Sequence, residues 1–323
     1  MQVAAIGGRD LCVSSPKDIA EYKAFIVGSG FGGQCAALAL RHRGVPDLRV
    51  VERRDFMGGT WSQTSYPGVD EHVCSPLYSI GDEPHECPQI YADQAELDEY
   101  TNHVLNKYGT YDVTGIDTNV ERATWDECAC HWFVQTSDIQ DYHALFAIPD
   151  SGPRSNTLMP EFEARGCFDG TSFHTNGWDS SYDYHGKRVT VTVIGSGASA
   201  AQGIPATAPE VEHLHVFQRA PHWIVPRLDR VFSKLGRFLL RSDFVTRVLR
   251  TVIDWNFESR VLSFKYSTRL LGILGARPAL KQPKQTPPIR SMVSVAERLP
   301  SHGTSFLAPT SARRCLDFPI CLL

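Results

Sequence analysis

The stretch AFIVGSGFGG at residues 24–33 decides the fold of this 323-residue chain. A run of strand-forming residues leads into a glycine-rich turn, and small residues suited to a helix follow it as far as Arg43. In such a unit Gly28 permits the tight turn, Gly30 lets the backbone approach a pyrophosphate, and Gly33 lets the helix pack closely on the strand. The pyrophosphate would lie at the positive end of the helix. The pattern therefore predicts a dinucleotide-binding turn.

A second turn of the same kind, VTVIGSGASA, occupies residues 191–200, and the two turns are followed by different decisive residues. Glu52 lies 24 residues past Gly28, whereas Arg219 lies 24 residues past Gly195. At that position a carboxylate accepts from free ribose hydroxyls, and an arginine pairs with a 2′-phosphate. Two purely structural turns would not explain this difference. We therefore expect one dinucleotide without a 2′-phosphate and one with it, for which FAD and NADPH are the natural pair.

Composition limits the class of protein. Hydrophobic residues make up 42% of the chain, and no apolar run reaches the roughly 18 residues of a membrane span, so we expect a globular cytoplasmic protein. The nine cysteines include no Cys-x-x-Cys pair, which argues against a disulfide framework or a zinc ribbon. Cys128, Cys130 and His131 lack a suitably spaced fourth ligand, so no metal site is predicted.

Charge is distributed unevenly along the chain. Residues 1–218 carry 14 Lys and Arg against 30 Asp and Glu, whereas residues 219–323 carry 18 against 6. A basic half can contact nucleic acid, but no nucleic-acid-binding motif accompanies it, so that partner is not expected. The basic amphipathic stretch Val231 to Trp255 could lie on a membrane surface. A helix packed on the protein with its arginines in water is the favoured reading.

Apolar periodicity predicts a helix over Ala92–Tyr108 and a β-hairpin formed by Thr124–Trp125 and Trp132–Val134. With the two turns, this predicts an α/β fold with two Rossmann-like dinucleotide-binding domains, for FAD and NADP, the second inserted in the first. The expected divisions are a leader at 1–20, the N-terminal part of the FAD domain at 21–135, a linker and NADP domain at 136–230, a helical region at 231–275 and an atypical tail at 276–323.

Between the two turns lies FDGTSFHTNGWD at residues 168–179, which resembles the Phe-x-Gly-x-x-x-His-x-x-x-Trp-Pro/Asp fingerprint of type I Baeyer–Villiger monooxygenases. These enzymes belong to the flavin-containing monooxygenase superfamily. The stretches GGTW at 58–61, YPG at 66–68 and FQRAPHW at 217–223 resemble the same family, and the resemblance extends over roughly residues 22–275. N- and S-oxygenating flavin monooxygenases share the layout but usually lack the Trp-Asp ending. As an alternative, the histidine and tryptophan of the fingerprint would be a helix cap and a core aromatic.

The resemblance implies FAD and NADPH as cofactors, with O2 and a small-molecule ketone as substrates. One oxygen atom would be inserted beside the carbonyl to give an ester or a lactone. The variants GGTWSQ and FQRAPHW are most similar to fungal secondary-metabolism members, which suggests a polyketide ketone, as in aflatoxin-type pathways.

The resemblance also assigns site residues. The FAD adenosine and pyrophosphate fall to Gly28, Gly30, Gly33 and Glu52, and positions nearer the flavin ring to Thr60, Trp61, Ser62, Gln63 and Tyr78. NADP contacts are expected from Gly195, Ser196, Gly197, Ala198, Ser199, Ala200, Gln202, Arg219 and Ala220. The candidate catalytic residues are His174 and Trp178, which would couple nucleotide binding to domain movement, and His72, which would lie near the flavin.

The chain departs from the family pattern at four places. His72 replaces an aspartate, with Asp70 two residues earlier, and Ala220 replaces a threonine after the phosphate-binding arginine. The segment 145–152 replaces a strand that ends in Ala-Thr-Gly. TPPIRSM at 286–292 does not match the stretch that carries the family's catalytic arginine, so we expect a truncated or aberrant C-terminal part. A catalytically inactive homologue is therefore a further alternative.

Overall fold

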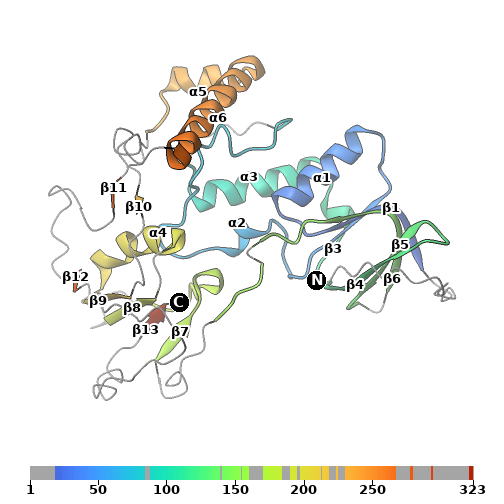
Figure 1. The fold of residues 1–323 in the computed structure, drawn as a ribbon, viewed down its shortest axis with the longest axis horizontal. Helices are drawn as coiled ribbons and strands as arrows, with labels where there is room; N and C mark the ends of the chain where they lie inside the picture. The colour runs from blue at the N-terminus through green and yellow to red at the C-terminus, as the bar shows by residue number, and fades with distance from the viewer. Residues whose placement is uncertain are drawn as a thin grey trace. The chain divides into compact units, whose positions relative to one another are not determined.

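The computed structural model divides into two compact units (Figure 1). Unit 1 comprises residues 1–63, 80–83 and 95–156, and unit 2 comprises residues 64–79, 84–94 and 157–323. The residues that the structure describes are 19–83, 88–138, 140–153, 155–159, 170–183, 190–194, 197–211, 213–217, 223–224 and 230–266, with short strands at 277–278, 292–293 and 320–322.

Unit 1 contains a six-stranded sheet with the order β3-β2-β1-β6-β5-β4. Its strands are β1 (Ala20–Val27), β2 (Leu48–Val51), β3 (Thr114–Gly115), β4 (Val120–Asp126), β5 (His131–Thr136) and β6 (Asp141–Pro149). Strand β1 pairs in parallel with β2 and β6, and β5 pairs in antiparallel fashion with β4 and β6. The predicted hairpin is therefore confirmed.

Helices α1 (Phe31–His42) and α3 (Gln94–Lys107) belong to the same unit, with the short helix α2 (Thr60–Gln63) and a 3-10 turn at Tyr111–Val113. Alternate residues of β1 face the two sides of the sheet, so Ala24 and Ile26 pack with Ala37 of α1, while Phe25 packs with Tyr142 of β6. Helix α3 confirms the helix predicted from periodicity. These contacts hold the first glycine turn between a buried strand and a buried helix face.

Unit 2 contains a parallel five-stranded sheet with the order β12-β9-β8-β13-β7. Its strands are β7 (Thr171–Phe173), β8 (Thr190–Ile194), β9 (His213–Phe217), β12 (Met292–Val293) and β13 (Ile320–Leu322). A βαβ unit runs from β8 through α4 (Ala198–Thr207) and a 3-10 turn at Ala208–Glu210 to β9. The Rossmann-like α/β class is confirmed. Insertion of the second domain in the first stays a prediction, because among the described residues no segment after Asn156 joins the first sheet.

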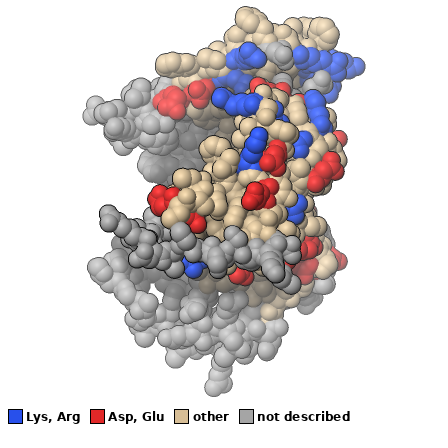
Figure 2. Space-filling model, turned by 90° about the vertical axis from the view of Figure 1, so that its right-hand side faces the viewer, with Lys and Arg blue, Asp and Glu red and all other residues tan. Residues whose placement is uncertain are grey.

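The basic stretch near residue 240 forms two helices, α5 (Lys234–Leu240) and α6 (Asp243–Tyr266), and β10 (Trp223–Ile224) pairs with β11 (Arg277–Pro278). Lys and Arg gather in Figure 2 over the upper part of the view, where Figure 1 places α5 and α6. Several apolar side chains of these helices are exposed, including Phe244 at 76% and Trp255 at 72%. Within the described residues, no helix is long and apolar enough to cross a membrane.

Candidate dinucleotide-binding sites

The first glycine turn joins the carboxyl end of β1 to the N-terminus of α1. Gly28 adopts a φ of +106°, a conformation open to glycine, and a Cβ there would strike the backbone of Asp150. A Cβ on Gly33 would strike the carbonyl oxygen of Gly28, so the helix and the strand approach too closely for any side chain. The turn therefore has the shape that a bound pyrophosphate requires at a helix N-terminus.

A second pair of glycines, Gly58 and Gly59, lies against this turn. Gly59 has a φ of +68°, and a Cβ on it would come within 2.7 Å of the Cα of Gly30. The backbone N–H of Gly58 donates to Ser29 Oγ at 3.2 Å. A Cβ on Gly30 would meet only Gly59 Cα, at 3.6 Å, which is ordinary van der Waals contact. The two glycine loops thus lie against each other through bare backbone, and we call this pair of loops the cradle.

Glu52 directly follows β2 beside the cradle and is only 4% exposed. Its Oε2 accepts hydrogen bonds from the backbone N–H of Ser29 at 3.0 Å and from Ser29 Oγ at 2.8 Å. Its Oε1 accepts from the backbone N–H of Arg54 at 3.3 Å. A carboxylate offers about four acceptor positions, so three bonds leave capacity for a ribose hydroxyl. The geometry is therefore compatible with the predicted adenosine contact.

Residues 60–63 form α2 directly after the second glycine pair. Trp61 is buried, Thr60 is exposed, and Ser62 Oγ donates to Asp98 of α3. Gln63 Oε1 accepts from the guanidinium of Arg54, whose Nη1 also lies 3.6 Å from Glu52 Oε1. Burial lowers the pKa of Arg54, and Glu52 only partly offsets that effect. The predicted Gly28, Gly30, Gly33, Glu52 and Thr60–Gln63 are thus brought together in unit 1.

The second glycine turn is described only in part. Gly195, Ser196, Arg219 and Ala220 lie outside the described residues. Gly197 caps α4 in an extended conformation, and Ala198, Ser199 and Ala200 form its first turn. Since β8 and β9 pair in parallel on either side of α4 in the chain, the βαβ arrangement that such a site requires is present. The contacts assigned to these residues stay predictions.

Gln202 of α4 holds the Tyr66–Asp70 segment. Its Oε1 accepts from Tyr66 Oη at 2.6 Å, and its Nε2 donates to the carbonyl of Asp70 at 2.7 Å and to the Asp70 carboxylate. Gly68 has a φ of +76°, and a Cβ there would come within 2.7 Å of Ala206 Cβ. The Tyr-Pro-Gly motif therefore packs directly on α4. Gln202 therefore has a structural role in holding this segment, and its expected contact with a pyrophosphate stays a prediction.

Tyr78 lies in a short segment that α6 fixes from the same unit. The Arg250 guanidinium donates to the carbonyl oxygens of Pro76 and Ser79, each at 3.1 Å, and to Ser79 Oγ at 2.8 Å. Tyr78 itself is half-buried. Helix α6 thus holds in place the loop that carries a predicted flavin contact, a role that its sequence pattern did not indicate.

The three predicted catalytic residues all belong to unit 2. His174 caps the 3-10 turn Thr175–Gly177, its Nδ1 accepting from the backbone N–H of Asn176 at 3.0 Å, and burial lowers its pKa. Trp178 packs edge-on against Phe173, with ring centroids 4.9 Å apart. His72 is exposed. His174 thus caps a helical turn and Trp178 packs on another aromatic ring, as the alternative interpretation of the fingerprint predicts. Their part in domain movement stays a prediction.

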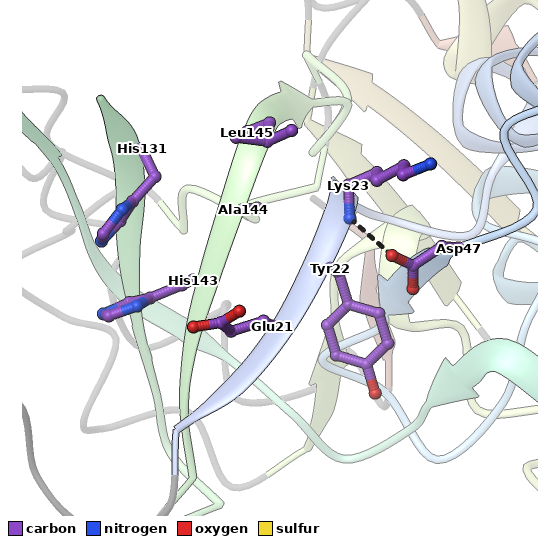
Figure 3. Close-up of a pocket in the computed structure, with 8 residues that line it drawn as sticks. All are labelled: Glu21, Tyr22, Lys23, Asp47, His131, His143, Ala144 and Leu145. Atoms are coloured by element: carbon purple, nitrogen blue, oxygen red, sulfur yellow. Dashed lines mark hydrogen bonds between the residues drawn. The ribbon is translucent and has the colours of Figure 1, made fainter. Parts of the chain in front are cut away.

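Unit 1 also has a shallow cavity of about 360 Å³ (Figure 3). None of the residues that line it is a predicted site residue. Figure 3 shows His131 of β5 beside His143 of β6, and their ring centroids are 4.0 Å apart. Burial and the neighbouring His131 lower the pKa of His143. No group of three or more potential ligands could hold a metal ion among the residues described.

Three residues of the first site were absent from the sequence prediction: Ser29, Gly59 and Asp150. Ser29 and Gly59 lay within motifs already quoted, and their glycine-rich context was the available signal. Asp150 follows β6, and its carboxylate lies at the N-terminus of α1, more than 100 residues away in the chain. A contact of that range leaves no signal in local sequence.

Comparison with known proteins agrees with this geometry. A model of the NAD(P)-binding Rossmann-like domain matches residues 26–87. A Baeyer–Villiger monooxygenase of Streptomyces coelicolor is 37% identical over 77% of this chain and 48% of its own length. The FAD-binding monooxygenase ktnD of Aspergillus niger is 31% identical over 77% of this chain and 41% of its own length.

Among solved structures, an oxidised steroid monooxygenase bound to NADP superimposes with a TM-score of 0.65 and 31% identity, over 71% of this chain and 44% of its own. The chain spans about half the length of the curated relatives it matches, or less. A glycine cradle beside a buried glutamate and a second βαβ unit thus occur in a chain that is similar to Baeyer–Villiger monooxygenases over most of its own length.

Proposed function

We propose that this chain binds FAD in the cradle of unit 1 and NADPH at the second glycine turn of unit 2. We further propose that it serves a monooxygenase reaction in which one atom of O2 enters a ketone to give an ester or a lactone. The observation that carries the proposal is Glu52, which is buried and held by Ser29 beside a bare-backbone cradle. The FAD-binding and NADP-bound relatives support the same pair of cofactors.

Bound flavin would supply the redox chemistry, accepting hydride from NADPH and activating O2. The residues of unit 1 would bind and orient it. Backbone N–H groups at the start of α1 would receive the pyrophosphate, and Glu52 would accept from the adenosine ribose. The hydrogen bonds of Ser29 keep the Glu52 carboxylate in one orientation before the nucleotide arrives, which lowers the cost of ordering the site.

For the substrate we propose a secondary-metabolite ketone of the polyketide class. The support is the similarity of GGTWSQ and FQRAPHW to the corresponding motifs of fungal secondary-metabolism members. Oxygenation of an amine or a sulfide is the alternative within the same superfamily.

The test uses the purified full chain incubated with FAD and then NADPH without oxygen. Visible flavin absorption that co-elutes with the protein, bleaches with NADPH and returns with air would support the proposal. A panel of ketones, amines and sulfides then identifies the reaction by product analysis. A protein that holds FAD but never bleaches would favour an inactive homologue, and one that takes up no flavin would overturn the proposed function.

A further inference from the structure

The N-terminus of α1 already carries a negative group from this chain. Asp150 directly follows β6, where its backbone N–H donates to the carbonyl of Val27 at 2.9 Å. Its carboxylate accepts a hydrogen bond from the backbone N–H of Gly33, and a Cβ built on Gly32 would overlap both carboxylate oxygens. The Asp150 side chain therefore lies over the first turn of α1.

This turn is where the cradle would receive a pyrophosphate. The first N–H groups of a helix have no partner within the helix, and an anion at the N-terminus binds to them. A carboxylate oxygen and a phosphate oxygen cannot both occupy the position in front of the Gly33 N–H. Because the carboxylate and the phosphate are both anionic, they would also repel each other when both are close to the N-terminus of α1.

The surroundings of Asp150 do little to offset that repulsion. Burial raises the pKa of Asp150, and the Gly33 hydrogen bond only partly opposes this effect. The titratable neighbour on α1 is the Cys35 thiol, whose own pKa is raised by burial and by Asp150.

The Asp150 side chain also has room to leave. Ser151, Gly152 and Pro153 are exposed, and a Cβ on Gly152 would meet nothing within 4 Å. Asp150 is itself partly exposed, and turning its side chain toward solvent does not require breaking the hydrogen bond from its backbone N–H to Val27.

We propose that Asp150 is an internal competitor for the pyrophosphate, so that a dinucleotide enters the cradle only when this carboxylate swings away from α1. The inference rests on the proposed binding of FAD in the same cradle. It predicts that the unaltered chain binds a pyrophosphate ligand more weakly than a variant without this charge.

The test compares the affinity of the full chain for FAD, and separately for ADP, in Asp150→Asn, Asp150→Gly and the control Asp112→Asn. Asp150→Asn keeps an oxygen that can accept from Gly33 and so preserves the cap, whereas Asp150→Gly removes the group altogether. Asp112 is an exposed carboxylate of the same unit, so its neutralisation changes the net charge equally. Unfolding midpoints without ligand show whether each variant is folded.

Both substitutions remove the charge-assisted hydrogen bond between the Asp150 carboxylate and the Gly33 N–H, and both remove the repulsion between that carboxylate and the pyrophosphate. Both Asp150 variants should therefore bind FAD and ADP about tenfold tighter than the unaltered chain. Asp112→Asn should bind as the unaltered chain does. Equal FAD affinity in all four proteins would overturn the competitor role and leave the proposed function standing. Tighter ADP binding by the Asp150 variants with no flavin uptake would support the competitor role and contradict the proposed function. Failure of every variant to bind either ligand would overturn both.

Discussion

Gly59 offers a direct test of the contact between the two glycine loops. In Gly59→Ala the new methyl group would lie 2.7 Å from the Cα of Gly30, at a backbone φ of +68° that side chains rarely adopt. Backbone atoms cannot give way as a flexible side chain does, so the loops must separate or the methyl group must be accommodated by strain.

Two effects add in the free energy of unfolding. A non-glycine residue in the left-handed region costs about 1–2 kcal/mol. Overpacking of a closely packed site costs about 1–3 kcal/mol more. We therefore expect Gly59→Ala to destabilise unit 1 by about 2–5 kcal/mol, of which roughly half is steric.

The matched control is Gly44→Ala. Gly44 has a similar φ of +73°, but a Cβ there would meet nothing within 4 Å, so this variant carries the backbone strain alone. Urea unfolding of the full chain, followed by circular dichroism without added nucleotide, would measure both variants. Equal destabilisation by the two substitutions would refute the close approach of Gly59 to Gly30.

Three further predictions follow from individual contacts. Ser29→Ala removes the hydroxyl bonds to Glu52 and Gly58, and should weaken FAD binding by about fivefold at a cost of about 1 kcal/mol in stability, measured by fluorescence titration and urea unfolding; unchanged affinity would show that Glu52 needs no such support. Gln202→Ala removes the amide that binds Tyr66 and Asp70, and should lower the free energy of unfolding of unit 2 by about 1–3 kcal/mol, measured by urea unfolding. Unchanged stability would contradict these hydrogen bonds. Burial acts to raise the pKa of Glu83, but hydrogen bonds from Lys107, Tyr108 and His103 outweigh it and leave the pKa below its ordinary value. Ionised Glu83 therefore stabilises the fold above the ordinary carboxyl pKa of about 4.3, where the unaltered chain should be more stable to unfolding than Glu83→Gln. This difference in stability should disappear as the pH falls below the lowered pKa, and a difference that persists at pH 2 would contradict the lowered pKa.

Local patterns predicted the parts of the fold that depend on neighbouring residues. The glycine turn at 28–33, the helix over 94–107 and the β4–β5 hairpin each follow from periodicity or backbone sterics within a few residues. The pairing of Glu52 with the first turn also followed from spacing, because a βαβ unit brings the end of its second strand back to the turn.

Contacts between distant segments could not be predicted in this way. The sequence predicted a nucleotide contact for Gln202, but it gave no sign that the same amide binds Tyr66 and Asp70, which lie more than 130 residues earlier. Asp150 was noticed only as part of an altered segment, because nothing in its neighbourhood shows that β6 ends at the N-terminus of α1. Such pairs depend on strand order in the sheet, which local sequence does not encode.

The central claim is that the cradle of unit 1 binds FAD, and Gly30→Ala tests it most directly. A Cβ on Gly30 would meet only Gly59 Cα, at 3.6 Å, and Gly30 already has an ordinary φ of −69°, so the fold should tolerate the methyl group. The measurement is a FAD titration of the full chain and of Gly30→Ala, followed by flavin fluorescence. We predict saturable binding by the unaltered chain, at least about tenfold weaker binding by the variant, and equal unfolding midpoints without FAD. Equal FAD affinity in two equally stable proteins would contradict the account.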